Sequence, residues 1–106
     1  MSDHKEAPYT LGEDGFPTSW GEAEHTVYDR VRAFVADAAD VSIEDVEPSA
    51  NIFEELKIDS LGLVLILVNL EDEFKVPRVD DDSEAAMQLL TPIDIVEFAM
   101  DAGGLR

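Results

Sequence analysis

Apolar side chains recur at helical spacing through residues 20–39: Val27, Val31, Phe34, Val35 and Ala38. Charged residues occupy the other faces. This pattern predicts an amphipathic helix from about Trp20 to Ala39. Directly before it, Ser19-Trp20-Gly21-Glu22 has the form of a capping box, in which a Ser and a Glu side chain accept hydrogen bonds from backbone N–H groups of the first turn. We therefore expect the helix to begin at this box.

The longest apolar run covers residues 61–70 and has almost no polar break, so periodicity alone does not separate a buried helix from a buried strand. Together with residues 71–74 the run is too long for an ordinary strand and gives about four helical turns. One stripe of this helix is the expected core face: Val64, Leu67, Leu70 and Phe74. Asp59 and Ser60 stand directly before the run, and both residue types cap helix N-termini. Ser60 is thus expected at a helix start.

Two further helices are predicted toward the C-terminus. Pro77 prevents the central helix from continuing, and residues 80–90 then open with acidic residues and continue with alanines and leucines, which favours a short third helix. Thr91-Pro92-Ile93-Asp94 places a capping residue before a proline at the first helical position, so a last helix is expected over residues 92–102, ended by Gly103-Gly104. The predicted fold class is an all-α, four-helix bundle with three longer helices and a short third one.

A long connection, residues 40–57, separates the first two helices. It carries hydrophobic residues that we expect to anchor it to the core: Val41, Ile43, Val46, Pro48, Ile52, Phe53 and Leu56. Residues 1–18 show no sustained period and are interpreted as a flexible N-terminal extension, while docking of Tyr9, Leu11 and Phe16 onto the remainder is the less favoured alternative. Residues 19–106 then form a single domain, and the protein is expected to be a monomer.

The charge of the chain narrows its possible partners. With 25 acidic and 7 basic residues the formal net charge is −18, which disfavours binding to nucleic acid or to an anionic membrane. Attraction to a basic partner surface and a mere contribution to solubility are equally good explanations of this charge. The chain has no cysteine and no secretory leader pattern, and its apolar run is well short of a membrane span, so we expect a cytoplasmic protein.

An enzyme with its own catalytic machinery is not expected. His4 and His25 have no neighbour that suggests a catalytic base, and Asp80-Asp81-Asp82-Ser83-Glu84 lacks the glycine and the final glutamate of a calcium loop. We therefore predict no metal site. Ser60 is the remaining candidate, because a phosphate esterified at a helix start would face backbone N–H groups and the positive end of the helix dipole. From position alone, however, a simple helix cap is the favoured interpretation of this residue.

A resemblance to a known family favours a modification site over a simple helix cap at Ser60. Asp59-Ser60-Leu61, with Glu54-Glu55-Leu56-Lys57-Ile58 before it and Leu70-Glu71-Asp72-Glu73-Phe74 after it, resembles the prosthetic-group attachment region of acyl carrier proteins. The order of predicted elements is also similar to that family from about residue 22 to residue 102. On this resemblance, Ser60 is interpreted as an attachment point.

The resemblance implies a 4′-phosphopantetheine arm that a phosphopantetheinyl transferase takes from coenzyme A and joins to Ser60, with acyl groups carried as thioesters on the terminal thiol. Asp59 and Leu61 would help that transferase and acyl-processing partners, such as an acyltransferase or a ketosynthase, to recognise the site. The partner enzymes would supply the chemistry and the carrier would supply presentation. The alternative from another class is an unmodified acidic interaction module in which Ser60 is only a helix cap.

The chain also departs from the family pattern. Members that serve fatty acid synthesis usually carry acidic residues on the exposed face of this helix, at positions that correspond here to Gly62 and Leu65. Gly62 is expected to leave room beside the arm. Leu61, Leu65 and Val68 fall at i, i+4 and i+7 and form a second apolar stripe, which is either a docking surface or is covered by a tilted helix or by the extension. These departures favour polyketide or other specialised synthesis over housekeeping fatty acid synthesis.

Overall fold

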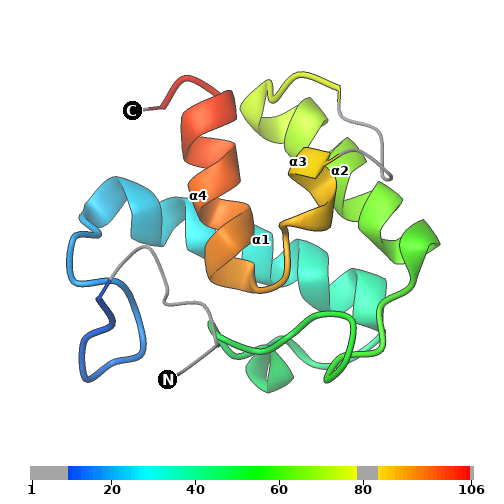
Figure 1. The fold of residues 1–106 in the computed structure, drawn as a ribbon, viewed down its shortest axis with the longest axis horizontal. Helices are drawn as coiled ribbons and strands as arrows, with labels where there is room; N and C mark the ends of the chain where they lie inside the picture. The colour runs from blue at the N-terminus through cyan, green and yellow to red at the C-terminus, as the bar shows by residue number, and fades with distance from the viewer. Residues whose placement is uncertain (1–9, 79–83, 106) are drawn as a thin grey trace, which may run out of the picture.

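The described part of the chain is all-helical. The computed structural model describes residues 10–78 and 84–105, and within these ranges it contains no strand beyond an isolated bridge between Leu11 and Pro17. Its elements, drawn in Figure 1, are α1 (Glu22–Ala39), a 3₁₀ turn η1 (Ile43–Asp45), α2 (Ser60–Phe74), α3 (Glu84–Met87) and α4 (Pro92–Ala102). The predicted all-α class is confirmed. None of the helices described is long and apolar enough to cross a membrane.

Helix α1 begins at Glu22, and the predicted capping box from Ser19 to Glu22 is wrong. Gly21 is the N-cap, and its N–H donates a hydrogen bond to the Glu24 carboxylate, 2.8 Å away. The helix starts later than expected because the preceding residues form a turn, in which the Trp20 N–H donates to the Pro17 carbonyl. Glu24, rather than Glu22, therefore accepts from the N-cap backbone.

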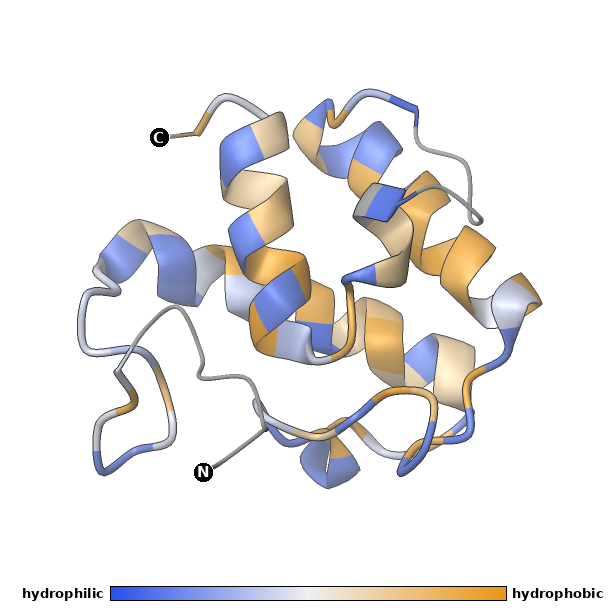
Figure 2. Cartoon of the chain, viewed as in Figure 1, coloured by the Kyte–Doolittle hydropathy of each residue, from blue (hydrophilic) through white to orange (hydrophobic). Residues whose placement is uncertain are grey.

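Helix α2 packs a different stripe into the core from the one predicted. Figure 2 shows that hydrophobic residues occupy most of its length, and the large side chains it buries are Leu63, Ile66, Leu67 and Leu70. Leu67 and Leu70 were expected in the core, but Val64 and Phe74 are only half-buried. Because α2 is apolar on nearly every side up to residue 70, its pattern does not reveal which side faces inward, and packing against the other elements decides this.

The C-terminal elements follow the predicted order. Thr91 caps α4, its hydroxyl accepting from the Asp94 N–H at 3.1 Å while the Asp94 carboxylate accepts from the Thr91 N–H at 3.2 Å, as the sequence predicted. Helix α3 is a single turn, shorter than the predicted helix over residues 80–90, of which residues 80–83 lie outside the described residues. One reason for its early end is that the Leu90 carbonyl accepts from the Ile52 N–H at 2.9 Å, which ties residues 88–90 to the long loop.

One hydrophobic core joins the elements, with α1 in contact with both α2 and α4. Loop residues Val46, Ile52 and Ile58 are buried in it, which confirms the first two as anchors. Val41 and Ile43 were also expected as anchors, but both side chains are exposed. Both residues follow Asp40, whose left-handed backbone ends α1 and redirects the chain before the loop reaches the core at Val46.

The described part of the N-terminal extension, residues 10–18, lies against α1. The Gly12 N–H donates to the Phe16 carbonyl at 2.7 Å and closes a turn. The Phe16 ring contacts those of His25 and Tyr28, with centroids 4.9 Å apart in each pair. Of the residues named in the docking alternative, Phe16 packs against α1, whereas Leu11 is exposed. Tyr9, named with it, lies outside the described residues.

Candidate functional site

The long loop forms two local turns directly before Ser60. Asn51 caps the first, its side-chain oxygen accepting from the N–H groups of Phe53 and Glu54, both at 2.9 Å. Lys57 then adopts a left-handed conformation with φ of 60°. The Ile58 N–H donates to the Ile52 carbonyl at 2.9 Å, which pins the end of the loop to the core directly before the candidate serine.

Asp59, and not Ser60, caps α2. One Asp59 carboxylate oxygen accepts from the Gly62 N–H at 2.9 Å, and its backbone carbonyl accepts from the Leu63 N–H at 3.0 Å. Ser60 is the first residue of the helix and is exposed, and its hydroxyl makes no hydrogen bond within the part of the chain that the structure describes. A serine in this position contributes little as a cap and is accessible to a modifying enzyme.

The start of α2 has the features that a phosphate ester needs. The first N–H groups of a helix have no acceptor within it. The Asp59 side chain satisfies the third of them, which leaves the N–H groups of Ser60 and Leu61 to face an anion bound at the helix end. An exposed hydroxyl beside two such donors fits a phosphate-linked prosthetic group.

Gly62 does not lie on the exposed face of α2, contrary to the expectation from the family pattern. It is buried against α1, and a Cβ atom added to it would lie 2.8 Å from Ile58 Cγ2 and 3.6 Å from Ala38 Cβ. The space beside Gly62 is therefore filled by protein, and the expectation that it leaves room for the arm is wrong. Glycine here lets the start of α2 approach the end of α1 closely.

The second apolar stripe of α2 is open to solvent in the described structure. Leu61, Leu65 and Val68 are 68%, 53% and 51% exposed. No described element covers them, so a tilt of α2 into the bundle does not account for the stripe. Up to residue 70 the helix carries no charge, so this face presents only apolar and neutral side chains beside Ser60. We call Leu61, Leu65 and Val68 the α2 stripe.

The surroundings of two residues, Met87 and His25, were not predicted from the sequence. Met87, assigned to the apolar part of the third helix, is 66% exposed and adds another large apolar side chain to the surface. His25, interpreted as a solvated residue, is half-buried and packs against the rings of Phe16 and Trp20. Helical spacing gives no signal for either, because both depend on contacts with segments outside their own helix. Over residues 10–78 and 84–105, no cluster of His, Cys, Asp or Glu could hold a metal ion.

Comparison with known proteins agrees with this geometry. The family model for the phosphopantetheine attachment site matches residues 29–99, which include Ser60 and most of α1 and α4. The matched fold and the exposed serine at a helix start define the class as a phosphopantetheine-binding carrier domain.

Similarity to individual proteins identifies the family. The chain is 35% identical over 71 residues to an acyl carrier protein of Nitratidesulfovibrio vulgaris, covering 67% of this chain and 93% of that protein. It is 38% identical over 72 residues to an acyl carrier protein of Thermosynechococcus vestitus, covering 68% of this chain and 85% of that one. The chain belongs to the acyl carrier protein family. Members of this family are carriers rather than enzymes, and their prosthetic group is 4′-phosphopantetheine.

Proposed function

We propose that Ser60 carries the 4′-phosphopantetheine group and that this protein presents acyl groups to partner enzymes. The observation that carries the proposal is the position of the Ser60 hydroxyl, exposed at the first residue of α2 and outside the capping interaction, which Asp59 makes. When bound, the group supplies a thiol on which acyl chains are held as thioesters.

The residues around Ser60 have separate tasks in this proposal. Asp59 fixes the first turn of α2 through its bond to the Gly62 N–H, and so holds the serine at the surface. The N–H groups of Ser60 and Leu61 stabilise the negative phosphate. Gly62 keeps the helix start close to α1, so that Ser60 stands on a rigid support.

The proposed fold is the four-helix bundle of the carrier family, with α3 as its short member. Residues 19–106 form the carrier domain, and residues 1–18 the extension. We further propose a monomeric protein that acts in the cytoplasm.

The proposed partners are a phosphopantetheinyl transferase and acyl-processing enzymes such as an acyltransferase or a ketosynthase. The net charge of −18 favours partners with basic surfaces. Asp59 and the α2 stripe lie beside Ser60 and are the proposed recognition surface, since exposed apolar side chains of this size mark interaction sites. Leu65, where housekeeping relatives carry an acidic residue, favours polyketide or other specialised synthesis. Gly62 is buried and therefore gives no support to this preference for specialised synthesis.

A loading experiment tests the proposal. The protein is incubated with coenzyme A and a phosphopantetheinyl transferase of broad specificity, and its intact mass is measured. We expect a gain of one phosphopantetheine in the unmodified sequence and in Ser49→Ala, an exposed serine of the loop that serves as matched control. Ser60→Ala should gain nothing. Equal loading of Ser60→Ala would refute the site, and no loading of any form would favour the unmodified interaction module.

A further inference from the structure

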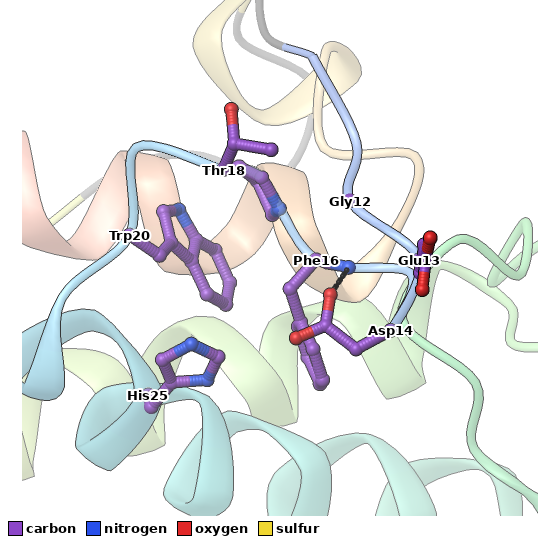
Figure 3. A pocket seen from close by; sticks show the side chains of 8 residues that line it. Gly12, Glu13, Asp14, Phe16, Thr18, Trp20 and His25 are labelled. Atoms are coloured by element: carbon purple, nitrogen blue, oxygen red, sulfur yellow. Dashed lines mark hydrogen bonds between the residues drawn. The ribbon is translucent and has the colours of Figure 1, made fainter.

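The N-terminal extension and the start of α1 line an open pocket of about 450 Å³ (Figure 3). One wall is the turn over residues 12–18, held by the hydrogen bond from the Gly12 N–H to the Phe16 carbonyl at 2.7 Å. The Asp14 carboxylate supports the same turn, accepting from the Phe16 N–H at 3.0 Å. Trp20 and His25 form the facing wall, as Figure 3 shows. The turn that forms this wall is therefore held by hydrogen bonds to its own backbone N–H groups.

The aromatic side chains of the pocket are fixed by contacts with the rest of the protein. His25 stands edge-on to both Phe16 and Trp20, with ring centroids 4.9 and 5.4 Å away. The Trp20 indole N–H donates to a Glu97 carboxylate oxygen in α4 at 2.6 Å. This bond fixes the wall to the last helix, but Trp20 itself is only 8% exposed, so the aromatic surface open to a ligand belongs to the half-buried rings of Phe16 and His25.

The charges around the pocket are negative. Glu13 and Asp14 are exposed residues of its lining, and no lysine or arginine occurs among the described residues that line it. Aromatic rings attract cations through their negative faces, and carboxylates pair with the planar guanidinium group in a bidentate manner. This combination selects a cation with a flat apolar surface, and arginine has both properties.

The pocket and the candidate attachment site lie at opposite ends of α1. Trp20 and His25 flank its N-terminus, whereas Ala38, near its C-terminus, contacts Gly62 of α2. Eighteen helical residues span about 27 Å at 1.5 Å per residue, so a partner held at the pocket would leave the Ser60 end free. We propose that this pocket binds an arginine side chain of a partner protein and provides a second docking point, independent of the prosthetic group.

The test uses N-acetyl-arginine amide as the probe and the indole N–H resonance of Trp20, the only tryptophan, as the readout in ¹H–¹⁵N NMR spectra. N-acetyl-citrulline amide, which has the same shape without the charge, is the control compound. We expect a saturable shift with the arginine compound and little shift with the citrulline compound. No saturable shift, or equal shifts with both compounds, would overturn the proposal without the use of any variant.

Paired variants then test the charges of the rim. Glu13→Gln with Asp14→Asn removes both carboxylates but keeps an oxygen for the Phe16 N–H, and should weaken probe binding about threefold to tenfold, as expected for two exposed ion pairs. Glu44→Gln with Asp45→Asn makes the same two changes at exposed positions of η1 and should leave binding unchanged. Equal weakening in both pairs would show a general effect of net charge and would contradict a specific site.

Discussion

Replacement of Gly62 by alanine tests how the protein supports the start of α2. Alanine gains about 0.5–1 kcal/mol of helix propensity over glycine. Its Cβ would lie 2.8 Å from Ile58 Cγ2, a branch of a buried side chain that cannot swing away. Overpacking of this kind typically costs about 1–3 kcal/mol, so Gly62→Ala should lower the free energy of unfolding by about 1–2 kcal/mol.

Thermal unfolding followed by circular dichroism measures this effect. For a domain of this size, the loss corresponds to a Tm lower by about 5–10 °C. Ile58→Leu is the matched background, because leucine has nearly the same volume but no branch at Cβ to meet the new methyl group. In that background the cost of Gly62→Ala should shrink to below about 0.5 kcal/mol. An increase in Tm, or an equal cost in both backgrounds, would refute the close contact between Gly62 and Ile58.

Three further predictions concern the surface and the caps. Leu65→Glu should change the free energy of unfolding by less than about 0.5 kcal/mol, since the side chain is exposed, but should slow turnover by partner enzymes. Leu67→Glu places a charge at a buried position of the same helix and should unfold the protein. Asp59→Asn keeps an acceptor for the helix and should preserve Tm, while Asp59→Ala should cost about 1 kcal/mol. A loss of transferase loading in the asparagine variant, whose fold is kept, would show that the charge is recognised, and full loading of that variant would contradict it. The hydrogen bond from Arg30 holds the pKa of Glu73 below its usual value, so the pair stabilises the fold at neutral pH and loses this effect as pH falls through the lowered pKa. The Tm difference between wild type and Glu73→Gln should therefore narrow in acid, and a constant difference would contradict the ion pair.

The predictability of the helix ends from sequence depends on how local their determinants are. The start of α4 was predicted correctly because Thr91 and Asp94, three residues apart, satisfy each other's backbone groups. The start of α1 was not, because a second residue pair with the same spacing, Gly21 and Glu24, competes with Ser19 and Glu22. The turn at Pro17 and the bond between Trp20 and Glu97 lie in this region, and the second joins residues 77 positions apart, which no local pattern can reveal.

Some features of the candidate site could likewise be predicted from local sequence, and others depend on the fold. Ser60 could be found from sequence because its neighbours form a local motif that the family shares. The α2 stripe could be recognised as a row at helical spacing, but not as the exposed one, because the buried row beside it is equally apolar. Gly62 was misplaced for a related reason: the side chains of Ile58 and of Ala38 in α1 close over this position, and the helical pattern of α2 does not show their approach. The pocket beside Phe16 has no periodic signal at all, since it forms where the extension meets α1.

The most direct test of the central claim is to locate the prosthetic group on the loaded protein. The protein is treated with coenzyme A and a phosphopantetheinyl transferase, digested, and its peptides are fragmented in a mass spectrometer. We expect a single phosphopantetheine, on the peptide that contains Ser60, with fragment ions that assign it to that hydroxyl. A group on another serine, or a fully unmodified Ser60 peptide under conditions that load a known carrier, would contradict it.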